Sequence, residues 1–154
     1  MQIEAGFWPV WQLLAGLQLD AGRSDLAIVS LQKARALSPA RAQLAANLGT
    51  LLGLLGQAAA ARELAGELTA LSRQRYVPPA LIASVHCALH EHDLALHWLE
   101  RAYAQRDVNL PFLTRCSVEL QADPRFDALR RRLQLSPLRD GFCAPLQAPT
   151  VGCH

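Results

Sequence analysis

Three histidines in the middle of the chain have the side chains and the spacing of metal ligands. His86 and His90 are four residues apart, so they share a face if the segment is helical, and His92 and Cys87 are close by. Nitrogen and sulfur ligands of this kind suit zinc. However, the chain has neither a Cys-x-x-Cys pair nor a His-Glu-x-x-His motif. We therefore expect His86, His90 and His92 to have packing and turn roles, and we predict no cofactor. Sensing of a metal or a small ligand through these three histidines is an alternative hypothesis.

Nucleophilic catalysis by a cysteine is the second chemistry to consider. Cys87 follows His86 directly, but neighbouring residues on a helix do not face each other. A thiol needs a base within hydrogen-bond reach to be activated. The sequence also offers no recognisable arrangement of Ser, His and Asp. We therefore expect no enzyme activity, and we expect Cys87 to be a small buried or groove-lining residue.

The cysteines are expected to be reduced thiols. Cys87, Cys116, Cys143 and Cys153 have no close paired spacing, and four are few for a disulfide scaffold. Met1 is not followed by a basic stretch and an apolar signal region, and no apolar run approaches the length of a membrane span. A cytoplasmic location and no membrane partner are therefore expected.

Three consecutive arginines near the C-terminus could contact nucleic acid. Arg130, Arg131 and Arg132 stand between Leu129 and Leu133, and two aspartates nearby dilute their charge. The formal net charge of the chain is only +2. Without a basic stripe across the domain, these arginines are expected to form a solvated helix face, and no specific binding of nucleic acid is predicted.

A period of 34 residues organises the chain in which these side chains lie. Ala27, Ala61 and Ala95 stand one period apart. Four further columns recur at the same interval: Leu14, Leu48 and Ile82; Ala15, Gly49 and Ala83; Gly22, Gly56 and His90; Ala34, Leu68 and Ala102. A fixed period of this length indicates an array of helical repeats.

Each repeat is expected to be a hairpin of two helices. Leucines recur in two successive segments, at three- and four-residue steps in the first, which predicts one apolar face on each helix. They are Leu13, Leu14 and Leu17, then Leu26, Leu31 and Leu37. Gly22 can adopt the left-handed conformation that ends a helix, and Ser24 is a good N-cap for the next one. Small side chains at Ala15, Ala27 and Ala34 allow the two helices to approach closely.

The expected helices fall into three repeats, at residues 8–41, 42–75 and 76–109. Within them the pattern predicts helices at 8–19, 24–37, 41–55, 58–73, 79–89 and 92–105. Residues 1–7 are expected to be the end of a truncated preceding repeat, so the first repeat would lack a neighbour.

The period fails after residue 109, where a capping segment at 110–135 is expected instead. Asp123 as N-cap and Pro124 at the first helical position predict a helix start. Phe126, Leu129 and Leu133 would form its apolar stripe, and the arginines around them would face water, as suits the end of an array. The tail at 136–154 has no periodicity and is expected to be disordered.

The repeat resembles the tetratricopeptide (TPR) repeat. The resemblance rests on the order of Leu14, Ala15, Gly22, Ala27, Ala34 and Pro39, with Trp11 three residues before Leu14. Residues 75–79, 93–103 and 123–135 further resemble the end of TPR regions in bacterial multidomain regulators that carry winged-helix, Ser/Thr kinase or cyclase domains. The resemblance implies an all-α, right-handed TPR-like α-solenoid of three hairpins with a C-terminal capping helix. His90 departs from it, because the family usually places glycine in this turn.

The resemblance also implies a function, that of a non-catalytic interaction scaffold or regulatory module. A peptide, a helix or a neighbouring domain would bind in a concave groove lined by the first helix of each hairpin. The groove residues would be Gln12, Gly16, Leu19, Asn47, Thr50, Leu54, Ser84, Cys87 and Ala88. Their small, uncharged side chains favour an apolar partner segment over a charged one.

The start of the first helix is expected to be an exposed apolar patch. Phe7, Trp8 and Trp11 would lie on the face that a preceding repeat would otherwise cover. Exposed apolar patches mark contact sites between proteins. Self-association through the N-terminal hairpin is therefore a second expected interaction.

Overall fold

The computed structural model describes residues 7–109 and 118–133, and all regular structure in these two ranges is helical. The eight helices are α1 (Trp8–Asp20), α2 (Ser24–Leu37), α3 (Ala42–Leu54), α4 (Ala58–Ser72), α5 (Pro79–Ala88), α6 (His92–Ala104), α7 (Val118–Gln121) and α8 (Pro124–Arg132). The predicted all-α class is therefore confirmed. The first six residues of the predicted repeat remnant at 1–7, residues 110–117 and 134–135 of the capping segment, and the tail at 136–154 lie outside the described residues.

The helices of the three hairpins begin and end within one residue of the predicted positions. Glycine and proline explain this agreement, because they stand at the turns and at the helix starts, where their backbone preferences act directly. Helix α8 begins at Pro124, as predicted. The short helix α7 was not predicted, because four residues give no periodic apolar pattern.

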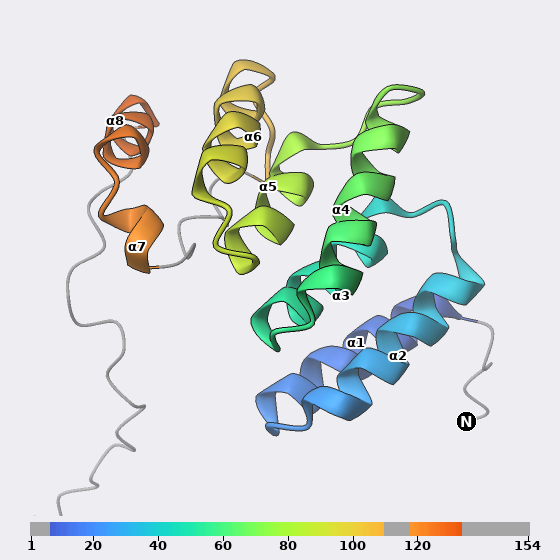
Figure 1. Cartoon of the computed structure of the whole chain (residues 1–154). Helices are drawn as coiled ribbons and strands as arrows, with labels where there is room; N and C mark the ends of the chain where they lie inside the picture. The colour runs from blue at the N-terminus through green and yellow to red at the C-terminus, as the bar shows by residue number, and fades with distance from the viewer. Residues whose placement is uncertain (1–6, 110–117, 134–154) are drawn as a thin grey trace, which may run out of the picture.

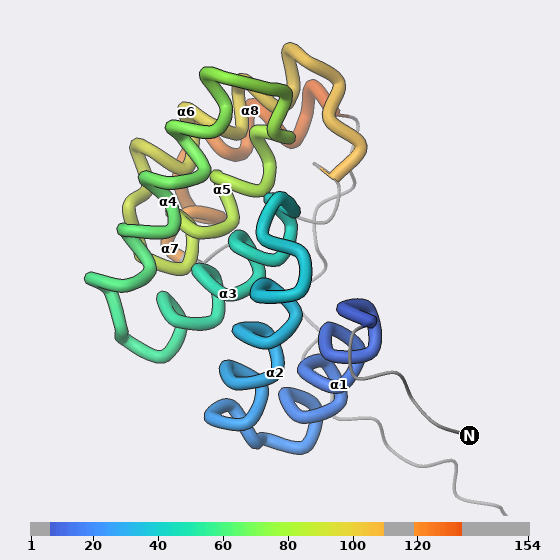
Figure 2. The backbone as a smooth tube through the Cα atoms, turned by 90° about the vertical axis from the view of Figure 1, so that its right-hand side faces the viewer, coloured from blue at the N-terminus to red at the C-terminus, as the bar shows by residue number. Residues whose placement is uncertain are grey.

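The helices pack in the order in which they occur. Helix α1 packs on α2, α3 on α4 and α5 on α6, and the hairpins contact each other mainly through α2 with α3, α3 with α5 and α4 with α5. Helix α8 contacts α6 and α7. The hairpins therefore lie side by side along the molecule (Figure 1). The side view has α1 and α2 at one end and α6 and α8 at the other (Figure 2).

The three turns inside the hairpins share one backbone conformation. Gly22, Gly56 and His90 have φ angles of 72°, 78° and 57°, so His90 adopts the left-handed form that glycine adopts at the two equivalent positions. After each of them a backbone N–H returns to the preceding helix, and the last of these bonds joins Glu91 N to His86 O at 3.0 Å. The expectation for Ser24 was wrong: it is the first helical residue, and its hydroxyl makes no capping bond.

Small residues bring the helices of each hairpin and of neighbouring hairpins close together. Ala15, Ala27 and Ala34 are all fully buried, as predicted. A glycine stands at the contact between α3 and α5, where a Cβ atom built on Gly53 would lie 2.9 Å from the Cβ of Ala88. Glycine at this point therefore sets the distance between the two helices that line the centre of the molecule.

The first hairpin departs from the prediction in how much of its apolar face is buried. Of the six leucines expected to face the core, only Leu31 is buried, and Leu13 and Leu17 are 67% and 58% exposed. Helix α2 is the only described helix with which α1 makes extended contacts. Periodicity shows which face of a helix is apolar, but it does not show whether another element covers that face.

Helix α8 is held by an acidic N-cap and by two buried side chains. Asp123 Oδ1 accepts the backbone N–H of Arg125 at 2.8 Å, which confirms the predicted cap. Phe126 and Leu129 are buried against the rest of the chain, and Leu133 is partly buried beside them. The capping helix is therefore fixed at its start by a hydrogen bond and along its length by apolar packing.

The cap makes the order of α8 dependent on pH. Hydrogen bonds from the Arg125 side chain and backbone lower the pKa of Asp123 below its ordinary value. Because the folded-state pKa is the lower one, the carboxylate stabilises α8 above the unfolded-state value of about 3.9, and this contribution is lost as the pH falls through the folded-state pKa. We expect the protection of the α8 amides, measured against their intrinsic exchange rates at each pH, to fall as the pH drops below the unfolded-state pKa of about 3.9. In Asp123→Ala the protection should be low at every pH; a variant that keeps the wild-type pH profile would contradict the assignment.

No helix in the described part of the chain is long and apolar enough to cross a membrane.

Candidate functional site

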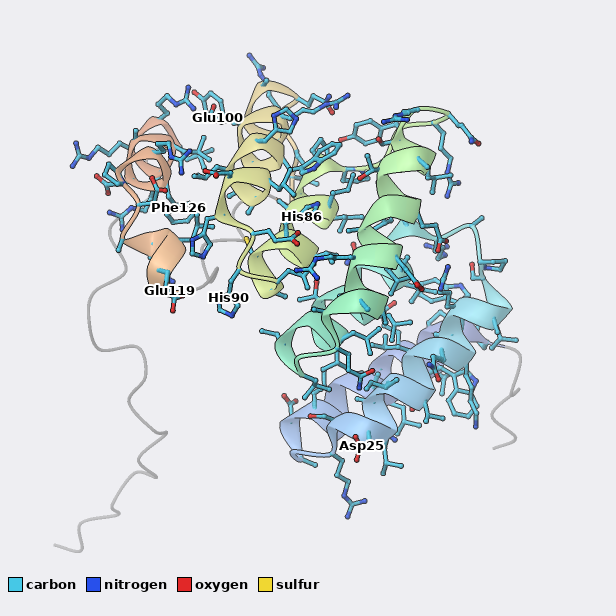
Figure 3. All side chains as sticks on the ribbon, viewed as in Figure 1. Asp25, His86, His90, Glu100, Glu119 and Phe126 are labelled. Carbon is cyan, nitrogen blue, oxygen red and sulfur yellow. The ribbon has the colours of Figure 1, made fainter. Side chains whose placement is uncertain are left out.

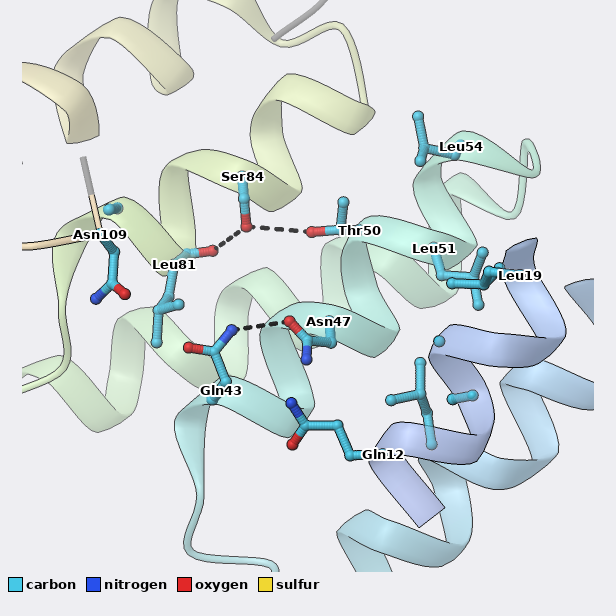
Figure 4. Close-up of a pocket in the computed structure, with 14 residues that line it drawn as sticks. Gln12, Leu19, Gln43, Asn47, Thr50, Leu51, Leu54, Leu81, Ser84 and Asn109 are labelled. Atoms are coloured by element: carbon cyan, nitrogen blue, oxygen red, sulfur yellow. Dashed lines mark hydrogen bonds between the residues drawn. The ribbon is translucent and has the colours of Figure 1, made fainter. Parts of the chain in front are cut away.

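The first helices of the three hairpins line one continuous hollow. It has a volume of about 560 Å³ and lies between α1, α3 and α5 (Figure 4). Seven of the nine predicted groove residues line it: Gln12, Gly16, Leu19, Asn47, Thr50, Leu54 and Ser84. The repeat period predicted these positions because residues one period apart occupy equivalent places on successive hairpins. We call this hollow the groove.

Four polar side chains of the groove are connected in two pairs. Gln43 Nε2 donates to Asn47 Oδ1 at 2.8 Å, one helical turn away on α3. The hydroxyls of Thr50 and Ser84 lie 3.1 Å apart and join α3 to α5. Ser84 also donates to the carbonyl oxygen of Leu81 at 2.7 Å. The amides of Gln43 and Asn47 keep further donors and acceptors that a partner backbone can use.

Two predicted groove residues lie outside it, in the interior. Cys87 and Ala88 are buried, and neither lines the hollow. Ala88 faces Gly53 across the α3 and α5 contact, so its small size serves helix packing. A boundary shift of one residue on a helix moves a side chain by about 100° around the axis, which is enough to take Cys87 and Ala88 from the groove to the core.

Cys87 is disulfide-bonded, so the predicted free thiol is wrong. The other cysteines of the chain, Cys116, Cys143 and Cys153, lie outside the described residues. None of them is near Cys87 in sequence, and spacing alone therefore gave no signal for the bond. Disulfides are not typical of cytosolic proteins, whose thiols are kept reduced.

Several groove residues were not predicted from the sequence. Leu51 and Leu81 form part of its apolar floor, and Gln43 lies on its rim one turn before Asn47. Gln43 could have been predicted from the sequence, because it stands four residues before Asn47 and residues four apart share a helix face. Asn109 had no such signal, since it follows α6 and reaches the groove from a loop.

A buried carboxylate places that loop. Asp107 is 5% exposed and accepts three hydrogen bonds. Its Oδ2 accepts the backbone N–H of Ala80 at 2.9 Å, in the first turn of α5, while its Oδ1 accepts the backbone and side-chain N–H groups of Asn109 at 2.9 and 3.0 Å. Asp107 thus supplies the cap that α5 lacks from its own N-cap residue, Pro78.

Replacing Asp107 should destabilise α5 and release Asn109. We expect Asp107→Ala to lower the free energy of unfolding by about 1.5–3 kcal/mol, because hydrogen bonds to a charged group are lost and buried N–H groups stay unpaired. Asp107→Asn keeps an acceptor oxygen and should lose less. Urea unfolding followed by circular dichroism measures both losses, and equal stability of the wild type and Asp107→Ala would contradict this role.

The three histidines do not form one cluster. His86 is buried, and its Nδ1 lies 2.7 Å from Oε2 of Glu91. The other carboxylate oxygen of Glu91, Oε1, accepts from Arg62 Nε at 2.6 Å. Partial burial raises the pKa of Glu91, but the hydrogen bonds from Arg62 and His86 outweigh it, and the net pKa is lowered. Figure 3 shows His86 apart from His90. The predicted ligand set of His86, His90 and His92 is therefore wrong with respect to His86, since this side chain is committed to packing and to Glu91.

The N-terminal patch is less open than predicted. Phe7 is 58% exposed, but Trp8 and Trp11 are only partly exposed. The guanidinium of Arg41 lies 4.1 Å from the ring centre of Trp8, and the ammonium of Lys33 lies 4.4 Å from that of Trp11, so cations cover both rings. Self-association through the first hairpin stays a prediction.

The arginines of α8 pair with carboxylates. Arg130 and Arg131 contact Asp127, and Arg132 contacts Glu100 of α6. Arg125 contacts Asp123, and also Asp93 of α6 at 2.8 Å. The predicted solvated face is thus neutralised by ion pairs, and phosphate groups would have to compete with these carboxylates.

Comparisons of this chain with protein-family models, with curated proteins and with solved structures give no match. The groove geometry therefore carries the functional argument.

Proposed function

We propose that the chain is a non-catalytic interaction module of the TPR type that binds a neutral, largely apolar protein segment in the groove. The observation that carries the proposal is the groove itself, which runs across the first helices of all three hairpins. Buried alanines between the helices, left-handed turns at equivalent positions and the 34-residue period support a right-handed TPR-like α-solenoid.

The lining of the groove indicates the chemistry of the partner. None of the fourteen residues that line it carries a formal charge. A carboxylate or phosphate clamp needs cations, which this lining does not offer. Leu19, Leu51, Leu54 and Leu81 provide an apolar surface, and the amides around them can pair with a partner backbone. A short apolar segment with few or no charges fits this combination best.

The volume of the groove limits how much of a partner it can hold. About 560 Å³ falls within the range of concave ligand sites, which is roughly 300–1,000 Å³. The groove would therefore hold a few side chains of an extended or helical segment rather than a whole domain face.

The test is a selection of displayed peptides on the purified full chain, followed by measurement of binding to variants. We expect the selected peptides to be neutral and apolar. The double substitution Asn47→Asp and Leu54→Arg should weaken their binding at least about tenfold, because it places charges in an apolar site. Helix content by circular dichroism shows whether this variant is folded.

A matched control places the same kinds of change on another surface. Gln32→Asp with Leu26→Arg changes two exposed residues of α2 that do not line the groove. This control should bind as the wild type does. Equal binding by wild type and the Asn47/Leu54 variant would reject the groove, and selection of strongly charged peptides would reject the proposed partner chemistry.

A further inference from the structure

The turn between α5 and α6 and the short helix α7 bring three metal-ligating side chains together. One ligand atom each of His90, His92 and Glu119 lies within 4.8 Å of the other two. His90 Nδ1 lies 3.7 Å from a carboxylate oxygen of Glu119, and the ring centres of His90 and His92 are 6.2 Å apart. His90 and Glu119 lie at the same end of the molecule, on neighbouring elements (Figure 3).

These distances are close to those of a bound zinc ion. Zinc holds nitrogen and oxygen ligands at about 2.0–2.2 Å in a tetrahedron, so neighbouring ligand atoms stand roughly 3.3 Å apart. The His90 to Glu119 distance of 3.7 Å nearly meets this value. Both side chains are 63% exposed, so rotation about their own bonds can close the remaining distance without disturbing the core.

The backbone at His90 is a second observation that favours a site here. His90 has a φ of 57°, where Gly22 and Gly56 occupy the equivalent turns. A side chain disfavours this conformation, which glycine adopts freely. The third hairpin thus carries a side chain in a turn where the other two hairpins carry none, and that side chain is a good metal ligand.

The other metal-ligating side chains of α5 do not compete for an ion at this turn. His86 is bound to Glu91, and the disulfide of Cys87 removes its thiolate. The contact between His90 and Glu119 is longer than a hydrogen bond. Helix α7 has no extended contact with α5 or α6 in the described part of the chain. Leu120 of α7 is nevertheless buried in the core, so an ion at the turn would give this helix a further point of attachment.

We propose that His90, His92 and Glu119 form a Zn²⁺ site that fastens α7 to the turn between α5 and α6. Two imidazoles and one carboxylate are a known type of three-ligand set for zinc, with a further position for water. Loading the site would further stabilise α7 in its place beside the turn. This proposal does not depend on the groove or on its partner.

The experiment is a calorimetric titration of the metal-free full chain with zinc chloride at about pH 7.5, where unperturbed histidine is neutral. Hydrogen–deuterium exchange at residues 118–121 is measured with and without zinc. We expect one ion to bind, exchange in α7 to slow, and His90→Gly or Glu119→Gln to weaken binding at least about tenfold. His90→Gly keeps the turn, because glycine is the residue at the two equivalent positions.

The matched control is His97→Gln, an exposed histidine of α6 outside the cluster. It should bind zinc as the wild type does. Absence of zinc binding would overturn the proposal, and so would equal affinity of the wild type, His90→Gly and Glu119→Gln. Zinc binding that leaves exchange in α7 unchanged would reject the fastening role, since the ion would then lie elsewhere.

Discussion

Gly53→Ala should destabilise the protein although alanine is the better helix former. The new Cβ would lie 2.9 Å from the Cβ of Ala88 and 3.2 Å from its carbonyl carbon, so α3 and α5 would have to move apart. Overpacking of this kind costs about 1–3 kcal/mol, which exceeds the gain in helix propensity of up to about 1 kcal/mol. Urea unfolding measures the net change in the free energy of unfolding, which we expect to be negative.

Gly66→Ala is the matched control for this prediction. Gly66 lies inside α4, and a Cβ built on it meets no atom within 4 Å. The same substitution should therefore stabilise the protein by about 0.5–1 kcal/mol. Adding Ala88→Gly to Gly53→Ala should restore part of the loss, because it removes the closest contact. If Gly53→Ala and Gly66→Ala change stability with the same sign, α3 and α5 are not in the close contact described.

A second large loss of stability is expected at one set of equivalent positions in the three repeats. Leu14, Leu48 and Ile82 occupy equivalent positions, but they are 36%, 4% and 0% exposed. Replacement by alanine should cost about 2–5 kcal/mol at Leu48 and Ile82, where a buried cavity forms. At Leu14 the loss should be about 1 kcal/mol or less, because the side chain is already partly in water.

Chemical unfolding of the three alanine variants measures this gradient. In an array, stability comes from each repeat and from its contacts with neighbours, so the first hairpin contributes least when one of its faces is open. Amide exchange should accordingly be fastest in α1 among the helices of the three hairpins. Equal losses in all three variants would mean that the face of α1 is covered in solution, as it would be in a dimer.

The positions of the hairpins could be predicted from the sequence because their signals are local. Gly22 and Gly56 end helices, Pro79 starts one, and the buried alanines recur with the period of the repeat. Each of these residues acts through its own backbone preference or its own size. For the same reason, seven groove residues could be predicted from the register of the repeat alone.

The contacts that could not be predicted join segments with no fixed spacing. Asp107 caps α5 from a loop that follows α6, and Glu119 meets His90 from a segment where the period has already failed. The prediction of His86 as a metal ligand was wrong for a related reason. It rested on the helical spacing of His86 and His90, which does not show that the side chain of His86 contacts Glu91.

The most direct test of the groove is to map where a selected peptide binds on the isotopically labelled protein by nuclear magnetic resonance. We expect the amide signals of α1, α3 and α5 to shift, with the largest changes around Asn47, Thr50 and Ser84, which line the groove. The outer helices α2, α4 and α6 should change little. Shifts concentrated on those outer helices, or on α8 alone, would contradict the proposal that this chain binds its partner in the groove.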